Sequence, residues 1–358
     1  MNQQKRILVA PLDWGLGHAS RCIPIIHELQ AQGAEVIVGA ANKPLKLLLH
    51  EFPNIEHVYM PGMNVAYPKR MPMSFFMARR APKFLKWVRE EQDIIQSIIQ
   101  SYNIDGIISD NRYGLFTSKI PCVLITHQLF IKASIFSFVF KNLTQFYASK
   151  YNFCWVPDFI GEPNLSGDLS HRKSKLENLR FVGPLSRFAI PAYYKPEVRY
   201  DLLVVLSGPE PSRTMLENNI MAQLRKSNLK SIVVRGLVDA ESEQEEVIGN
   251  ITRLAYLTSN KLQKAILMSK MVLCRSGYSS IMDLSKLQKK AFFVPTNGQT
   301  EQEYLASKLM KQGLAFYTTR SKLSIDEQYE EALNFSGLGI EWDDDLLKNS
   351  VHEFLSKT

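Results

Sequence analysis

The chain has 358 residues, which suits two domains of ordinary size better than a single core. Its 45% hydrophobic and 22% charged residues are typical of a soluble globular protein, and no apolar run reaches the roughly 18–20 residues of a membrane-spanning helix. The net charge of +8 lies almost wholly in residues 1–186, with 21 Lys and Arg against 14 Asp and Glu, so we expect an anionic partner for this half: a phosphorylated acceptor, a lipid surface or nucleic acid.

The first half of the chain alternates short apolar runs with helical patterns. Buried strands are expected at residues 5–11, 35–41, 104–109, 121–126, 152–156 and 178–184. A helix is expected from about residue 19 to residue 32, ended by Gly33. Because the first strand pattern has no signal-peptide layout before it, we expect a cytoplasmic protein.

The pattern restarts after a segment rich in proline and tyrosine. Residues 187–200 are expected to form a linker, and further strands are expected at 201–206, 231–234, 252–254, 271–274 and 291–294. This predicts a first domain at 1–186, a second at 201–340, and a C-terminal helix within 341–358 that could pack back on the first domain. Apolar strands alternating with helices predict an α/β fold of two Rossmann-like domains with parallel sheets.

Open parallel sheets bind ligands beyond the carboxyl ends of their strands. Two such sheets facing each other would form a central cleft with loops on both walls. Functional residues are therefore sought in the loops that follow the predicted strands, and three of these loops stand out.

The first loop runs from Asp13 to Arg21 and reads DWGLGHASR. Gly15 and Gly17 allow tight turns, and the N-terminus of the following helix offers free N–H groups to a phosphate or an oxyanion. The spacing G-x-G-H is neither the G-x-G-x-x-G of dinucleotide-binding folds nor a P-loop. His18, at the mouth of the turn, is a candidate catalytic residue, and its structural alternative is helix capping or packing.

The second loop reads CRSGYSSIMD and spans residues 274–283. Small residues and hydroxyls at a helix N-terminus can cradle a diphosphate, and they are provided here by Ser276, Gly277, Ser279 and Ser280. Asp283 lies one turn into the helix and could accept hydrogen bonds from a ribose diol. The structural alternative is an ordinary run of N-capping serines.

The third loop reads PTNGQTEQE and spans residues 295–303, ahead of a helix expected at 304–312. Its amides and carboxylates can satisfy several hydroxyls at once, as a sugar requires. The candidates are Asn297, Gln299, Glu301 and Gln302. The structural alternative is a polar loop that caps the next helix.

These loops, in this order, resemble those of the GT-B glycosyltransferases, particularly the MurG branch. The first turn of that family ends in Gly-Gly-His, and Gly-Leu-Gly-His18 occupies the place here. The family's C-R-S/A-G run followed by an acid is matched by Cys274-Arg275-Ser276-Gly277 through Asp283, and its acidic or amide residues before the next helix by Glu301 and Gln302.

The resemblance implies a metal-independent, inverting glycosyltransferase of cell-envelope polysaccharide, which moves a hexose or N-acetylhexosamine from a UDP-sugar to a glycan or lipid-linked acceptor. It places the diphosphate on the second loop, the ribose at Asp283 and the sugar hydroxyls on the third loop. Further donor-binding residues are expected at strand ends that line the same pocket: Ser207, Gly208, Arg213, Arg235, Leu257 and Arg275.

The first domain departs from this pattern, because the Gly-rich loops after its later strands are replaced by SDNRYG at 109–114 and THQ at 126–128. The acceptor is therefore left open. The expected acceptor-binding or anion-binding residues are Asp13, Gly15, Gly17, Arg21, Asn111 and Arg112. The string from Gly15 to Cys22 also resembles a hydrolase of the same fold that removes UDP from a UDP-sugar in pseudaminic acid synthesis.

A transfer reaction requires a base within reach of the acceptor hydroxyl. His18 is the first candidate, followed by Asp110 and His127, with Asp13 as a weaker alternative. Helix N–H groups and nearby Arg side chains can stabilise the leaving UDP without a metal, so no cofactor is expected beyond the nucleotide-sugar. The four cysteines form no CxxC pair, and the three acids at 343–345 are interpreted as a solvated helix start rather than a metal site.

Residues 63–89 form a basic and apolar segment with seven Lys and Arg and no acid. Such a segment suits an anionic membrane surface or a polyprenyl-phosphate acceptor, which would make the protein peripheral on the cytosolic face of a membrane. The structural alternative is amphipathic helices that cover the sheet, with Pro82 expected to break any single long helix. No nucleic-acid-binding module is visible, so nucleic acid is not expected as a partner.

Three functions remain open at this point: a sugar transferase, a nucleotide-sugar hydrolase of the same fold, and a non-catalytic GT-B module that binds a sugar nucleotide. A sugar-nucleotide 2-epimerase shares the fold, but no residue singles it out.

Overall fold

The computed structural model divides the chain into two compact units. The first unit comprises Met1–Leu185 and Trp342–Thr358, and the second comprises Ser186–Glu341. The structure describes residues 4–13, 15–62, 73–130, 137–189, 197–237, 245–343 and 345–358, without the side chains of 73–81 and 137–142.

The first unit is built on a parallel seven-stranded sheet with the order β3-β2-β1-β4-β5-β6-β7. Its strands are β1 (Arg6–Pro11), β2 (Glu35–Ala40), β3 (Glu56–Tyr59), β4 (Gly106–Asp110), β5 (Cys122–Ile125), β6 (Phe153–Val156) and β7 (Leu179–Phe181). The central strands are buried throughout, as parallel strands covered on both faces must be.

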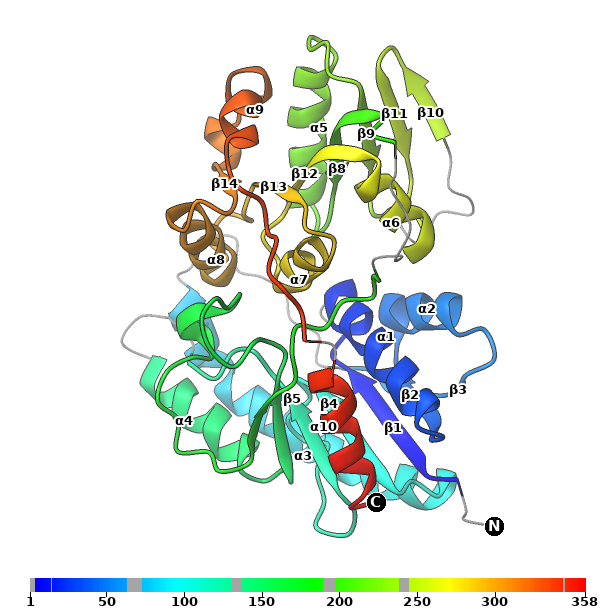
Figure 1. Ribbon diagram of the computed structural model, residues 1–358. Coiled ribbons are helices and arrows are strands. Elements are labelled where there is room, and N and C mark those ends of the chain that lie inside the picture. Colours follow the sequence, from blue (N-terminus) through cyan, green and yellow to red (C-terminus); the bar gives the residue numbers. More distant parts are fainter. Residues whose placement is uncertain are drawn as a thin grey trace. The chain divides into compact units, whose positions relative to one another are not determined.

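The helices of this unit are α1 (Leu16–Ala31), α2 (Asn42–Glu51), α3 (Met73–Tyr102), α4 (Ser137–Ala148), the short η1 (Gly167–Leu169) and α10 (Asp345–Leu355). The C-terminal helix α10 returns to the first unit and packs against α1 (Figure 1). Its Phe354 is fully buried and meets Trp155 of β6 edge to face, with the ring centroids 6.2 Å apart. The last residues of the chain therefore complete the core of its first half.

The second unit has its own seven-stranded sheet with the order β10-β11-β9-β8-β12-β13-β14. Its strands are β8 (Tyr200–Val205), β9 (Ser231–Val234), β10 (Glu245–Ile248), β11 (Ile251–Leu254), β12 (Ser269–Cys274), β13 (Lys290–Phe293) and β14 (Phe316–Tyr317). Its helices are α5 (Ser212–Leu224), α6 (Ser259–Leu267), α7 (Tyr278–Lys286), α8 (Thr300–Lys311), the short η2 (Arg320–Lys322) and α9 (Ile325–Leu333). Every pairing is parallel except that of β10 with β11.

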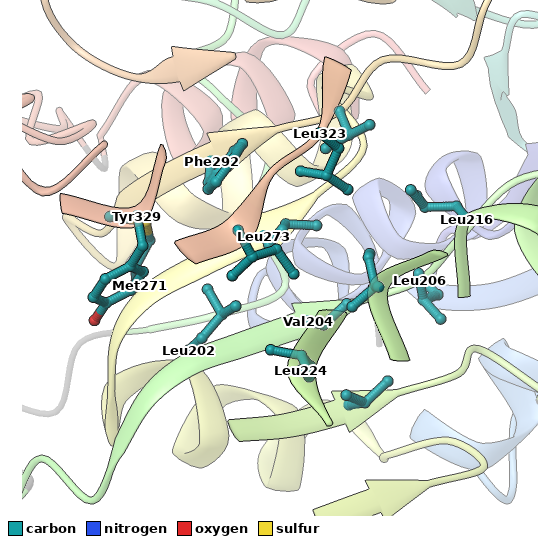
Figure 2. Packing of buried hydrophobic residues seen from close by; sticks show 14 of the residues in the cluster. Leu202, Val204, Leu206, Leu216, Leu224, Met271, Leu273, Phe292, Leu323 and Tyr329 are labelled. Atoms are coloured by element: carbon teal, nitrogen blue, oxygen red, sulfur yellow. The ribbon is translucent and has the colours of Figure 1, made fainter. Parts of the chain in front are cut away.

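The core of the second unit forms where α5 and α9 pack on the central strands. Leu202 and Val204 of β8 lie beside Leu273 of β12, and Leu216 and Leu224 of α5 close over them (Figure 2). These side chains are almost completely buried, and each contributes about 1.5–3 kcal/mol relative to full exposure. This packing fixes the strand ends from which the loops of the second unit start.

The predicted α/β architecture with two Rossmann-like sheets is confirmed, but three strands were missed. β3 and β10 are mostly exposed, so neither carries the continuous apolar run that marks the other strands, and β14 has only two residues. The hairpin of β10 and β11 also makes the second sheet mixed rather than wholly parallel.

Two predicted helix boundaries were wrong. α8 begins at Thr300, four residues earlier than expected. Pro82 lies inside α3 and does not break it. A proline removes one hydrogen bond of the helix ladder, and burial of Trp87 and Val88 against Leu12 stabilises the turns that follow.

Candidate active site

The first unit gathers polar residues where β1, β4 and β5 end. These strands are neighbours, and their register pairs Pro11 with Asp110 and Asp110 with Ile125. The sheet order reverses between β1 and β4, which is where open α/β sheets bind their ligands. The loop from β1 into α1 and the last residue of β4 therefore meet at this point.

His18 and Arg21 lie one turn apart on α1 and both contact Asp110. Gly15, with φ of 115°, caps the helix start in a conformation that other residues rarely adopt. Nδ1 of His18 lies 3.0 Å from Oδ2 of Asp110. Nε of Arg21 donates to the same oxygen at 2.6 Å, and its Nη2 donates to Oδ1.

The charges of this cluster are set by burial. Asp110 is completely buried, which would raise its pKa, but Arg21 and His18 outweigh burial and lower the pKa of Asp110 to about 2. Burial and then Arg21 lower the pKa of His18, against the opposing effect of Asp110. At neutral pH the cluster thus holds an ionised carboxylate, a guanidinium and a neutral imidazole.

The contacts of His18 in the described part of the chain are made through Nδ1, which leaves Nε2 as the nitrogen that a substrate can meet. His127, which follows β5, joins the cluster because its Nδ1 lies 3.3 Å from Nη1 of Arg21. His127 is only 4% exposed, whereas the side chain of His18 is 17% exposed. The three predicted catalytic residues are therefore brought together, and His18 is the most accessible of them.

The other residues predicted in this unit take different positions. Arg112 is buried, and its guanidinium is engaged by Glu91 at 2.6 Å and by two backbone carbonyls. Burial raises the pKa of Glu91 in spite of Arg112. Asn111 adopts a positive φ of 56° directly after β4, and Asp13 accepts the N–H of Gly62 at 3.0 Å.

Gly17 lies in the first turn of α1, next to His18. Both predicted glycines of the first loop thus sit at the start of this helix, and Gly15 is exposed.

The second unit has its predicted anion site at the start of α7. Gly277 is the N-cap and has no side chain with which to cap the helix, and no acidic residue lies in the first turn. Ser279 and Ser280 are half-buried in this turn. Backbone N–H groups at a helix start and its positive dipole end favour an anion there.

Arg275, in the second loop, joins this loop to the start of the third loop and to the first residue of α5. It donates from Nη1 to the carbonyls of Val294 and Pro295 at 2.8 Å, and from Nη2 to the hydroxyl of Ser212 at 3.0 Å. Burial, and then the charge of Arg320, lower the pKa of Arg275 to about 10, so it stays cationic at neutral pH. Its Nε is buried and has no hydrogen-bond partner.

A pocket of about 180 Å³ opens beside this arginine, lined by Pro211, Ser212, Met215, Arg275, Asn297 and Arg320. Among the described residues no carboxylate lies within ion-pair distance of Arg275 or Arg320. Within the described part of the chain, Nη1 of Arg320 meets only the weak acceptor Sδ of Met215, at 3.3 Å. Two cations without an acid make this pocket suited to an anionic group.

Asp283 is paired within the second unit. Its Oδ1 accepts the hydroxyl of Ser186 at 2.7 Å, and its Oδ2 lies 3.4 Å from Nε of Arg187. Burial raises the pKa of Asp283 above its usual value, although Arg187 and Ser186 oppose this rise. A ribose at this carboxylate would share it with the hydroxyl of Ser186 and with Arg187.

Arg213 and Arg235 are engaged by a common carboxylate. Glu217 of α5 accepts from Arg213 at 2.8 Å, from Arg235 at 2.6 Å and from Arg253 at 2.7 Å. Burial would raise the pKa of Glu217, but the three arginines outweigh it and lower it. This cluster fixes α5 to β9 and β11. Ser207 and Gly208 are exposed after β8, and Leu257 is half-buried.

The third loop is held by side chains from α8. Gln302 receives the N–H of Thr296 on its Oε1 at 2.8 Å, and its carbonyl accepts the hydroxyl of Ser276 at 2.8 Å. The second and third loops are therefore joined. Asn297 is exposed, and Gln299 and Glu301 are half-buried.

Sequence reasoning missed Ser186, Ser212 and Arg320. Ser186 and Ser212 stand in segments without a motif, and Arg320 follows β14, which is too short to be recognised. The feature that distinguishes Arg320 is that no carboxylate among the described residues pairs with it. This becomes visible only in the folded structure.

The described residues show neither a metal-binding cluster nor a membrane-spanning helix. No group of three or more His, Cys, Asp or Glu there could hold a metal ion. None of the helices described is both long and apolar enough to cross a membrane. Of the basic segment, 63–72 and the side chains of 73–81 lie outside the described residues; in the remainder, Lys83, Lys86 and Arg89 are exposed and Trp87 and Val88 are buried.

Comparisons with known proteins bear on both units. Residues 205–336 match the model of the glycosyltransferase family 28 C-terminal domain. A search of curated proteins gave no significant match.

Solved structures match over nearly the whole chain at low identity. They include the glycosyltransferase SnogD from Streptomyces nogalater, with 14% identity, 99% of this chain and 95% of that chain covered, and a TM-score of 0.58. MurG from Acinetobacter baumannii has 13% identity, 99% and 95% coverage, and a TM-score of 0.53. Spinosyn rhamnosyltransferase SpnG complexed with thymidine diphosphate has 15% identity, 98% and 92% coverage, and a TM-score of 0.54.

These similarities of fold cover both units, while the family match lies in the second unit alone. Residues 205–336 therefore match a glycosyltransferase family 28 C-terminal domain, and the solved structures show that the chain has the GT-B fold.

Proposed function

We propose that the protein transfers a hexose or N-acetylhexosamine from a UDP-sugar to a glycan or lipid-linked acceptor, without a metal and with inversion at the anomeric carbon. The observation that carries this proposal is the contact of a neutral His18 with the buried, ionised Asp110. His18 can therefore act as a base at the carboxyl end of the strands of the first sheet. The second unit matches the family 28 C-terminal domain.

In the proposed reaction Nε2 of His18 takes the proton of the acceptor hydroxyl. The hydroxyl oxygen bonds to the anomeric carbon as the bond from that carbon to the diphosphate breaks. In this step Oδ2 of Asp110 accepts the proton of Nδ1–H, which orients the imidazole and stabilises the imidazolium that forms. A single displacement of this kind inverts the anomeric carbon.

The leaving diphosphate gains negative charge, and the second unit offers cationic groups and dipoles to it. The start of α7 supplies the positive end of a helix dipole, Arg275 precedes this helix in sequence, and Arg275 and Arg320 together line one pocket. Stabilisation by preorganised donors requires no metal. SpnG, which shares the fold, is described in complex with thymidine diphosphate, and this supports a nucleoside diphosphate donor here.

The test is turnover with a panel of UDP, GDP, dTDP and CMP sugars, preceded by thermal-shift measurements. UDP release that depends on an added acceptor is expected. UDP release without an acceptor would favour a nucleotide-sugar hydrolase, and stabilisation by UDP without turnover would favour a non-catalytic binding module.

We also propose that the protein acts in the cytoplasm and that residues 63–89 bring it to an anionic membrane face, because they carry seven basic residues and no acid. Co-sedimentation with anionic vesicles, lost as salt rises, is expected. Equal binding to neutral vesicles, or none to either, would contradict the membrane role.

A further inference from the structure

The protonation site of His18 is contested by two groups. Its Nδ1 lies 2.7 Å from Nη2 of Arg21 and 3.0 Å from Oδ2 of Asp110. In a neutral imidazole, Nδ1 is either a donor or an acceptor. It can donate to Asp110 or accept from Arg21, but it cannot do both.

The hydrogen atoms of Arg21 favour acceptance. One hydrogen of Nη2 goes to Oδ1 of Asp110, so the other is left for Nδ1 of His18. If Nδ1 carried a proton, two N–H donors would oppose each other at 2.7 Å, which is short even for a hydrogen bond between nitrogens.

Asp110 does not depend on His18 for a partner. Nε of Arg21 already donates to its Oδ2 at 2.6 Å, and together with Nη2 this gives the two-point pairing that guanidinium and carboxylate groups prefer. The unfavourable contact in this arrangement is between the lone pair of Nδ1 and Oδ2 of Asp110. These atoms are 3.0 Å apart, farther than Nδ1 is from Nη2 of Arg21.

We propose that Arg21 is a positioning residue that sets the protonation site of His18: by donating to Nδ1, it holds the neutral imidazole with its proton on Nε2. Before Nε2 can act as a base, its proton must leave to solvent and a solvent proton must bind Nδ1, so that Asp110 replaces Arg21 as the partner of Nδ1. This inference rests on the proposed function in one respect, namely that Nε2 is the nitrogen that meets the acceptor.

The burial of Arg21 supports a positioning role. Its side chain is 2% exposed, and its guanidinium faces His18, Asp110 and His127. Among the described residues, the charged or titratable neighbours of the His18 ring are Arg21, Asp110 and His127. A side chain so enclosed acts on the reaction through His18 rather than by touching substrate.

The test is nuclear magnetic resonance of protein labelled with ¹⁵N at its histidines, recorded without substrate at a pH where His18 is neutral. Correlations between ring protons and nitrogens distinguish the two tautomers. The chain has seven histidines, and the spectrum of His18→Gln identifies the signals of His18. The wild type is expected to show the proton on Nε2 of His18.

Two variants are expected to move that proton to Nδ1. Arg21→Lys keeps a positive charge beside Asp110 but lacks the second donating nitrogen, and Arg21→Met removes both charge and donors. Arg112→Met is the matched control, because Arg112 is also a buried guanidinium paired with a carboxylate, and it does not contact His18. It should leave the tautomer unchanged.

A wild-type spectrum with the proton on Nδ1 would overturn the proposal, and so would Arg21 variants with the wild-type tautomer. If the variants do not fold, the wild-type spectrum decides alone. Because no substrate is present, the result is independent of transferase activity, and failure of the proposed function would appear only in the turnover measurements.

Discussion

His18 is the side chain on which the proposed chemistry depends most directly. His18→Ala is expected to lower kcat/KM roughly 100- to 10,000-fold, the range of general base catalysis, while UDP binding to the second unit is retained. Steady-state kinetics and UDP titration measure the two effects. His50→Ala, at an exposed histidine of α2, is the control and should keep full activity. Turnover of His18→Ala within a few-fold of wild type would exclude His18 as the base.

The pH dependence of the reaction follows from the same residue. A base must be neutral to act, and burial and Arg21 hold the pKa of His18 below its ordinary value of about 6.5. The rate kcat/KM should therefore rise with pH through a value below 6.5 and level off above it. Asp110 opposes this lowering, so Asp110→Asn should move the acidic limb to still lower pH. A limb that stays in place in this variant would argue against the pairing.

Single residues were recognisable from the sequence only through their place after a predicted strand. His18, Asp110 and His127 were each singled out as candidates on that ground, but their order as bases could not be decided. What joins them is Arg21, which links β4, α1 and the loop after β5 through contacts that span up to 106 residues of chain. Pairings of this kind depend on the register of β1 with β4, which a single sequence does not contain.

Among the elements of the second unit, Arg275 joins the loop after β12 to the loop after β13. Arg275 and Arg320 line the same pocket. Arg320→Met is expected to weaken UDP binding about tenfold, the loss of one charge-assisted hydrogen bond, because the half-buried side chain of Arg320 meets only the thioether of Met215 among the described residues. Calorimetric titration with UDP measures this. Arg172→Met, at an exposed arginine of the first unit, is the control. Equal affinity in both variants would remove Arg320 from the donor site.

The segment after β6 is held by one buried carboxylate. Asp158 accepts the N–H groups of Leu165 and Ser166 at 3.0 and 2.8 Å and lies 3.1 Å from Nε2 of His171. Asp158→Ala leaves these donors without a partner and should destabilise the first unit by about 3 kcal/mol. Urea unfolding followed by tryptophan fluorescence measures the loss, and a change below about 0.5 kcal/mol would contradict this account.

The same carboxylate makes stability depend on acid. Burial would raise the pKa of Asp158, but the hydrogen bonds of His171, Leu165 and Ser166 outweigh it and lower it. Because the pKa of Asp158 is lower in the folded state, this group stabilises the fold at pH values above its unfolded pKa of about 3.9. The stabilisation is lost as the pH falls below that value towards the folded pKa. Wild type should thus lose stability more steeply below about pH 4 than Asp158→Ala.

Elements were predictable to the extent that they are buried. The central strands carry continuous apolar runs, and the structure places them within one or two residues of the predicted ranges. β10 was missed although Gly249 and Asn250 separate it from β11 as a hairpin turn, because three of its four residues are exposed. The prediction that Pro82 breaks the helix was wrong. The rule that proline disrupts a helix is local and does not include the packing of Trp87 in the folded unit.

At the scale of the whole molecule, the chain closes its first unit with its last helix. Gly106 of β4 lies so close to Phe354 that a β-carbon there would approach the phenyl ring to 2.6 Å. Residues nearly 250 positions apart therefore share one core. The C-terminal helix was predicted as an element, and its packing on α1 and the burial of Phe354 against Trp155 are properties of the folded unit.

The tryptophans make this dependence measurable, since Trp87, Trp155 and Trp342 lie in the first unit and the sequence of the second unit, residues 186–341, contains none. Phe354→Ala removes a fully buried ring from beside Trp155 and should cost about 3–5 kcal/mol. The unfolding midpoint seen by tryptophan fluorescence should fall accordingly. Leu224→Ala empties an equally buried site in the second unit and should leave that midpoint in place. An unchanged midpoint in Phe354→Ala would mean that the first unit folds without its C-terminal helix.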